Sequence, residues 1–174
     1  MERLNARKEL WMEPLIALVV VTLVLLTLGA LGVKRLRPWV VPLRGGLAVM
    51  FLLTGGAHFI GMREDMIRMV PPVLPAPGLI VTVTGVLELL GAAGLLWRRT
   101  APLAAACLSV LLVLMFPANV YAAIAGVMTA PYDQLLPRTL MQIVFLSATM
   151  AVVVHDVRAR RRSPHLSLSP VRQS

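Results

Sequence analysis

The polar residues of this sequence that could do chemistry lie inside long apolar runs. Glu88 stands near the centre of one run, at a depth where a carboxylate costs about 2.5 to 3.5 kcal/mol on membrane-insertion scales. At helical spacing its neighbours are Thr84, Gly85, Gly91 and Ala92. Because these residues are small, they leave room beside the carboxylate for another helix, a water molecule or a ligand. Glu88 is therefore the first candidate for a polar site within a membrane.

Four other polar side chains are predicted to lie in the same half of the membrane. His58 lies about one turn from the surface, Asn119 about two turns, and Glu88 about three turns. Arg138 and Gln142 are four residues apart, so they share one helix face. If these polar groups faced lipid they would have no hydrogen-bond partners, at a free-energy cost of several kcal/mol for each group. We expect them to point inward and form a chain from Arg138 through Gln142, Asn119 and His58 to Glu88, as a candidate ligand-binding site.

Each of these residues also has a structural interpretation. Glu88 could be a hydrogen-bonded link between helices, and His58 could be structural. Asn119 could satisfy a backbone carbonyl that Pro117 leaves free, and Arg138 could reach the lipid headgroups. The sequence alone leaves both interpretations open.

The composition indicates the class of protein that holds these residues. Of 174 residues, 58 % are hydrophobic and only 14 % are charged, and the mean hydropathy is +0.81. A soluble domain carries about 25 % charged residues. The apolar runs are continuous rather than alternating, so they predict membrane-spanning helices and not a barrel. The predicted fold class is an all-α membrane protein with spans at residues 15–33, 40–60, 78–97, 101–125 and 137–155.

The first apolar run and the longest connection each have features of their own. Residues 15–33 could be a signal peptide, but the run is long, and Lys34, Arg35 and Arg37 follow it directly and oppose export. In the connection, residues 61–70 predict a short amphipathic segment at the membrane interface. The four prolines of residues 70–77 predict a stiff, extended segment.

The charges predict the orientation of the chain. The net charge is +9 and the pI is near 11.4, but the cations flank apolar runs, which is a topology pattern and argues against nucleic-acid binding. One set of flanks (34–44, 98–99, 156–174) holds eleven Lys and Arg, and the other set (1–13, 61–77, 126–138) holds six. We therefore expect an extracytoplasmic segment at 1–13 and a cytoplasmic, basic and disordered tail at 157–174.

The sequence shows no self-contained catalytic or redox centre. Cys107 is the single cysteine, so no intrachain disulfide and no CxxC motif exist. There is no metal-ligand set, haem-ligand pair or flavin motif either. Whether the protein is an enzyme is left open, and any electrons would have to come from a partner.

Five motifs in order resemble the DoxX-like family of small bacterial membrane proteins. They are Gly55-Gly56-Ala57-His58-Phe59, the segment from Val70 to Pro75, the segment from Thr84 to Gly91, the segment from Phe116 to Tyr121, and Arg138-Thr139-Leu140-Met141-Gln142. The resemblance implies a four-helix transmembrane bundle at residues 40–156 in the bacterial cytoplasmic membrane. Residues 14–33 are then an added N-terminal helix. In relatives the last motif tends to read Arg-Leu-Pro-Leu-Gln, and only its Arg and Gln ends are present here.

The resemblance and the polar residues together support two functions. Relatives are linked to membrane redox systems, including a small subunit of a thiosulfate:quinone oxidoreductase. The first function is a binding or accessory component that holds a quinone-like lipophilic molecule and works with a membrane or redox partner. The second is a non-enzymatic scaffold or assembly factor in which the polar cluster is structural. A small transporter is a third interpretation, which the absence of inverted repeats opposes. A homo-oligomer is compatible with all three.

Overall fold

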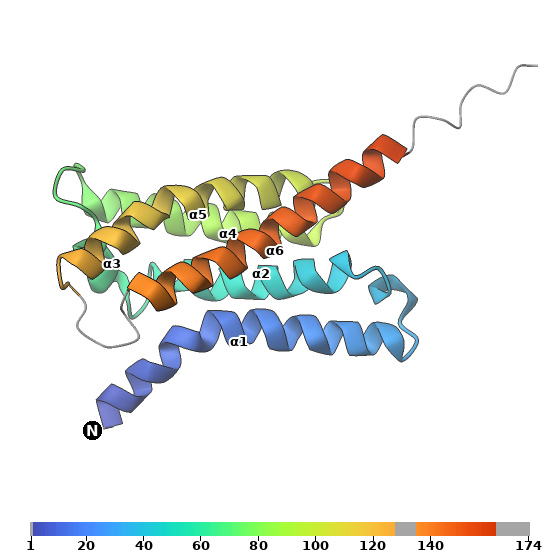
Figure 1. The fold of residues 1–174 in the computed structure, drawn as a ribbon, viewed down its shortest axis with the longest axis horizontal. Helices are drawn as coiled ribbons and strands as arrows, with labels where there is room; N and C mark the ends of the chain where they lie inside the picture. The colour runs from blue at the N-terminus through green and yellow to red at the C-terminus, as the bar shows by residue number, and fades with distance from the viewer. Residues whose placement is uncertain (1, 128–134, 163–174) are drawn as a thin grey trace, which may run out of the picture.

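The computed structural model describes residues 2–127 and 135–162 of the chain. Within these residues the protein is entirely helical, with no strand (Figure 1). The elements are α1 (Glu2–Ala30), the 3-10 helix η1 (Lys34–Leu36), α2 (Val40–Ala57), α3 (Arg63–Met69), α4 (Pro77–Leu96), α5 (Ala101–Ile124) and α6 (Leu135–Arg162). The predicted all-α class is confirmed.

Five of the described helices are long and apolar enough to cross a membrane, namely α1, α2, α4, α5 and α6. The protein is therefore a multi-pass membrane protein.

Two helices are longer than predicted. Helix α1 begins at Glu2 and continues through Pro14, and α6 continues to Arg162. The first residues of the predicted tail are thus helical, because a run of arginines suits both helix propensity and the negative end of the helix dipole. The rest of that tail lies outside the described residues.

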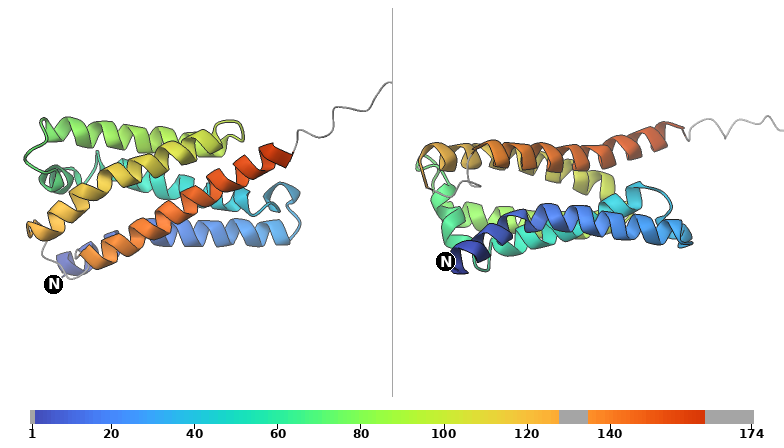
Figure 2. Two further views of the ribbon diagram at one scale, coloured as in Figure 1. Left: turned by 45° about the horizontal axis from the view of Figure 1, so that its top comes forward. Right: turned by 60° about the horizontal axis from the view of Figure 1, so that its bottom comes forward.

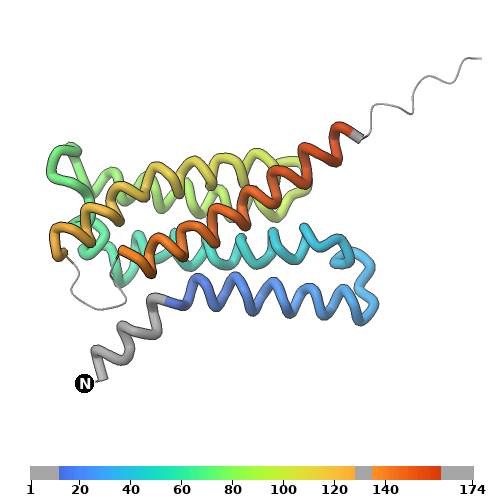
Figure 3. The backbone as a smooth tube through the Cα atoms, viewed as in Figure 1, coloured from blue at the N-terminus to red at the C-terminus, as the bar shows by residue number. Residues whose placement is uncertain are grey.

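The long helices lie side by side along the long axis of the molecule (Figures 1 and 2). Helix α2 packs against α1, α4 and α6, and α5 packs against α4 and α6. Helices α2, α4, α5 and α6 therefore close a ring, whereas α1 packs chiefly on α2. The backbone tube shows the end of α6 and the connection between α1 and α2 at the end of the bundle that lies opposite α3 (Figure 3).

Glycines bring neighbouring helices close together. A Cβ atom on Gly46 would collide with Thr22 Oγ1 and lie 2.7 Å from the Leu18 carbonyl oxygen of α1. A Cβ atom on Gly85 of α4 would lie 2.6 Å from His58 Cβ, and one on Gly91 would lie 2.5 Å from a methyl group of Leu108 on α5. The room predicted beside Glu88 is therefore filled at these two glycines by neighbouring side chains.

The two halves of the bundle are packed differently. The hydrophobic core fills the half that contains the α4–α5 turn, where Leu47, Phe51, Leu95, Leu108 and Val152 are almost completely buried. The other half is capped by α3 and by the proline-rich turn that follows it. Short connections and large interlocking side chains close the first half, and the second half holds a cavity.

The proline-rich connection is not extended throughout, contrary to our prediction. The backbone N–H of Leu74 donates to the Pro71 carbonyl over 2.9 Å, which closes a turn. Pro72 occupies the second position of this turn, where its fixed φ angle is favourable. Pro77 then begins α4 at a position that needs no N–H donor.

Candidate functional site

A cavity of about 560 Å³ lies in the half of the bundle that α3 caps. Its walls come from the C-terminal parts of α2 and α5, from the N-terminal parts of α4 and α6, from α3 and the turn after it, and from Glu13 and Pro14 of α1. Most of the lining is apolar, and its flexible part is a set of methionines: Met62, Met66, Met69, Met115 and Met141. The polar lining residues are Glu13, Thr54, His58, Thr84, Asn119 and Arg138. This is the composition of a site for a lipophilic molecule with a few polar atoms.

One wall of the cavity is formed by polar groups of α2, which connect to Glu88 on α4. The hydroxyl of Thr54 donates a hydrogen bond of 2.6 Å to Glu88 Oε2. His58 Nδ1 lies 2.9 Å from the backbone carbonyl of Thr54. A carbonyl can only accept, so Nδ1 carries the proton, and Nε2 is an acceptor in the neutral ring. Both Glu88 and His58 are buried.

A second wall of the cavity is formed by polar groups of α5 and α6. Arg138 Nη1 donates a hydrogen bond of 2.7 Å to Asn119 Oδ1. Because the Asn119 oxygen is engaged in this way, its NH₂ group is the donor that remains for other contacts. Gln142 Nε2 donates over 2.7 Å to the backbone carbonyl of Leu112, in the part of α5 that precedes Pro117. Arg138 is buried, so it does not extend to the surface as a headgroup anchor would.

The five predicted residues do not form one continuous chain. Thr54 joins His58 to Glu88, Arg138 bonds Asn119, and Gln142 bonds neither group. His58, Asn119 and Arg138 line the cavity, and Glu88 and Gln142 do not. Thr54 hydrogen-bonds Glu88 and itself lines the cavity, and Gln142 is occupied by the backbone of α5. Our prediction that all five meet one another is thus only partly met by the geometry.

The sequence interpretation missed two residues that shape this site. Thr54 links His58 to Glu88, and its signal in the sequence is its position four residues before His58, on the same helix face. Arg63 of α3 donates to the carbonyls of His58 and Gly78, each over 3.2 Å, and to Thr82 Oγ1 over 3.0 Å. Arg63 therefore holds α3 against the end of α2 and the start of α4, and it fixes the edge of the cavity.

Polar pairs also join the helices away from the cavity. Arg44 of α2 forms an ion pair with Asp156 of α6, and both side chains are largely buried. Ser109 of α5 donates a hydrogen bond of 2.8 Å to Thr149 of α6. These pairs are separated by 112 and 40 residues in the sequence, which is why no local pattern indicated them.

In the part of the chain that the structure describes, no group of three or more His, Cys, Asp or Glu residues could hold a metal ion. The lining of the cavity can accept a hydrogen bond through His58 Nε2 and can donate one through the NH₂ group of Asn119, around an otherwise apolar molecule.

Residues 47–160 match the model of a protein family described as a domain of unknown function (DUF8561). The chain belongs to this family. The matched region contains all five candidate residues and both walls of the cavity, and it leaves α1 outside. No curated protein and no solved structure matches the chain.

Proposed function

We propose that the protein holds a quinone-like lipophilic molecule in the cavity and is a binding or accessory component of a membrane redox system. The observation that carries this proposal is that polar groups from α2 and polar groups from α5 and α6 line one otherwise apolar, methionine-rich cavity. A quinone or quinol has an apolar ring and two oxygen atoms on opposite sides, so it needs polar partners at two ends.

The hydrogen-bonding capacity of each wall fits one end of such a molecule. The NH₂ group of Asn119, whose oxygen Arg138 already occupies, offers an N–H donor, which suits a carbonyl oxygen. His58 Nε2 accepts when the ring is neutral, which suits the hydroxyl of a reduced quinol. A quinone that is reduced would take its electrons from a partner protein, and a quinol that is oxidised would give its electrons to one, because the sequence supplies no redox centre.

The proposal includes an arrangement of the chain in the membrane. Helices α2, α4, α5 and α6 form a DoxX-like four-helix unit, and α1 is an added helix on its side. The contacts of α1 with α2 and the start of the family match at Leu47 support this division. The distribution of Lys and Arg supports the bacterial cytoplasmic membrane with the N-terminus outside and the cavity in the outer half.

Native mass spectrometry of the protein in mild detergent, titrated with decylubiquinone, tests the proposal. We expect one bound molecule for each chain. Asn119→Leu should weaken binding about 10-fold to 100-fold, because it removes a hydrogen bond beside a charged group. Arg68→Gln, on α3 but outside the cavity lining, is the control and should bind like the parent. Equal binding by all three proteins, or none by the parent, would contradict the proposal.

One observation favours the second candidate, a scaffold or assembly factor. Glu88, Asn119, Arg138 and Gln142 all form hydrogen bonds within the bundle, so their polarity has a structural use without any ligand. This candidate predicts that a membrane protein partner co-purifies in mild detergent and remains bound to Asn119→Leu. The same mass spectra report both ligand and partner, so they separate the two candidates.

A further inference from the structure

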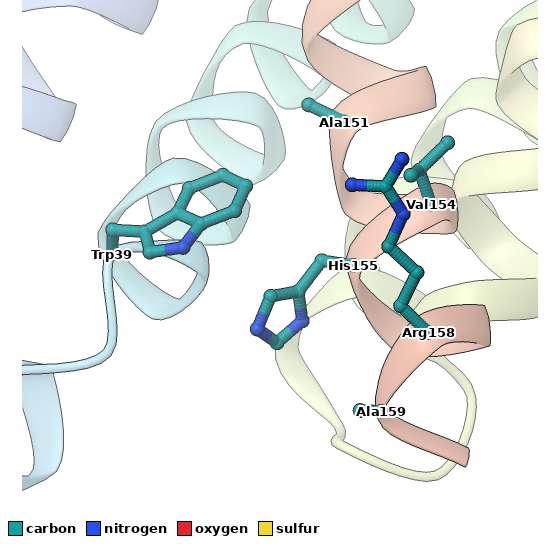
Figure 4. Close-up of a pocket in the computed structure, with 6 residues that line it drawn as sticks. All are labelled: Trp39, Ala151, Val154, His155, Arg158 and Ala159. Carbon is teal, nitrogen blue, oxygen red and sulfur yellow. The ribbon is translucent and has the colours of Figure 1, made fainter. Parts of the chain in front are cut away.

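A second hollow lies at the other end of the bundle, between the start of α2 and the last turns of α6. Its volume is about 410 Å³, and it is lined by Trp39, Ala151, Val154, His155, Arg158 and Ala159 (Figure 4). None of these residues lines the cavity that α3 caps. The hollow is therefore a separate site, and a ligand held there is independent of the proposed function.

The polar side chains of this hollow are Trp39, His155 and Arg158, and none of them is acidic. Arg158 is exposed and has no ion-pair partner among the residues that the structure describes. The Trp39 ring meets the His155 ring edge to face, with centroids 5.3 Å apart and an interplanar angle of 86°. His155 Nδ1 lies 3.2 Å from Asp156 Oδ1, and that carboxylate is already paired with Arg44. The charge of Arg158 is thus not offset within the hollow.

The direction of Arg158 matters as much as its charge. Figure 4 shows its side chain folded back along α6, with the guanidinium near Val154 and with Trp39 on the other side of the hollow. Side chains on a helix tilt toward the helix N-terminus, which for α6 is the direction of the membrane interior. The guanidinium therefore lies beside the apolar groups of the hollow and is still exposed, so that an anion can approach it.

The surrounding charge favours such an anion. This end of the bundle also carries Lys34, Arg35, Arg37, Arg98, Arg99, Arg160 and Arg161. Among the described residues here, the single acid is Asp156, which is neutralised by Arg44. A field of this sign concentrates anions near the surface, and anionic lipids above all because they lie in the same plane.

The apolar part of the hollow fits a lipid chain. Ala151 and Val154 form a wall of small side chains that runs along α6 into the spanning segment. Trp39 is half exposed, which suits a ring at the boundary between headgroups and hydrocarbon. We propose that this hollow binds an anionic phospholipid, with the phosphate on the Arg158 guanidinium and the Trp39 indole N–H, and with an acyl chain along Ala151 and Val154.

The test compares the binding of phosphatidylglycerol, phosphatidylethanolamine and glycerol phosphate to detergent-purified protein by native mass spectrometry. We expect phosphatidylglycerol to be retained most strongly. Arg158→Gln should reduce its retention about tenfold, because a guanidinium–phosphate contact is lost. Arg160→Gln removes the same charge from the same end of α6 outside the hollow, and should change retention by less than about twofold.

A second measurement locates the lipid. In a Trp11→Phe, Trp97→Phe background, Trp39 is the single tryptophan, and phosphatidylglycerol with brominated acyl chains should quench its fluorescence. Arg158→Gln should reduce this quenching, and Arg160→Gln should not. Equal effects of the two substitutions, equal retention of phosphatidylethanolamine, or equal binding of glycerol phosphate without acyl chains would each overturn the proposal. The last result would identify a site for free phosphate esters.

Discussion

Thr54 provides the hydrogen bond that satisfies a carboxylate between two membrane helices. Its hydroxyl lies 2.6 Å from Glu88 Oε2, and Glu88 is only 4 % exposed, so no water can easily replace that donor. We predict that Thr54→Val destabilises the protein by about 1 to 3 kcal/mol, because a buried acceptor is left without its partner. Unfolding in mixed micelles, followed by circular dichroism, measures the change.

Thr27→Val is the matched control for this prediction. Thr27 lies on an exposed face of α1, and its hydroxyl donates only to the Leu23 carbonyl of its own helix. The same chemical change there should alter the free energy of unfolding by less than about 0.5 kcal/mol. If Thr54→Val and Thr27→Val had equal effects, the Thr54–Glu88 hydrogen bond would contribute nothing specific to stability.

At the scale of the elements, the contact between α2 and α4 depends on glycines that face the partner helix. A methyl group added at Gly85 would lie 2.6 Å from His58 Cβ and 2.9 Å from His58 Cγ, and would push the helices apart. We predict that Gly85→Ala destabilises the bundle by about 1 to 3 kcal/mol through overpacking. Because His58 lines the cavity, the same substitution should also weaken decylubiquinone binding.

Gly56 gives the opposite expectation within the same pair of helices. A Cβ atom there would meet nothing within 4 Å. Gly56→Ala should therefore stabilise α2 by about 0.5 to 1 kcal/mol, since alanine loses less backbone entropy on folding than glycine does. Denaturant titrations measure the free energy of unfolding of Gly56→Ala and Gly85→Ala and so test both predictions. Destabilisation by Gly56→Ala, or tolerance of Gly85→Ala, would show that close helix approach is not what these glycines provide.

The elements themselves could be predicted from the sequence, but their contacts could not. An apolar run of about twenty residues has one stable state in a bilayer, so the five long helices follow from composition. The depth of a polar residue also follows from its position along a helix. Its direction around the helix axis does not, because that depends on which neighbours pack against it. Gln142 was expected at the cavity for its depth, and it instead bonds the Leu112 carbonyl.

In the candidate site too, single residues could be predicted from the sequence and their contacts could not. Glu88 and His58 were recognised because charged or ionisable groups are costly in lipid, whatever their partners are. Thr54 was not predicted, because a threonine in a membrane helix costs little free energy and is common. Only the structure shows that it joins His58 to Glu88. The Arg44–Asp156 pair was missed since it joins α2 to α6 across most of the chain.

For the whole molecule, the helix arrangement separates two kinds of site. Large core side chains close one half of the ring of α2, α4, α5 and α6, and the cavity occupies the other half. The second hollow, which is lined by Trp39, His155 and Arg158, lies beyond the closed half, at the opposite end of α2. A molecule in the cavity is therefore separated from that end by a packed core, so the two sites should respond independently to substitutions.

The orientation of the bundle in the membrane can be tested at two exposed positions. Ile60, next to the cavity end, is 80 % exposed, and Leu31, at the basic end of α1, is 78 % exposed. In a Cys107→Ser background we expect a membrane-impermeant maleimide to label Ile60→Cys in intact spheroplasts. Leu31→Cys should react only after the membrane is permeabilised, because the proposed orientation keeps the basic flanks in the cytoplasm. The reverse pattern would place the cavity on the cytoplasmic side. Labelling of both cysteines from outside would show that the chain between them, which includes α2, does not cross the membrane.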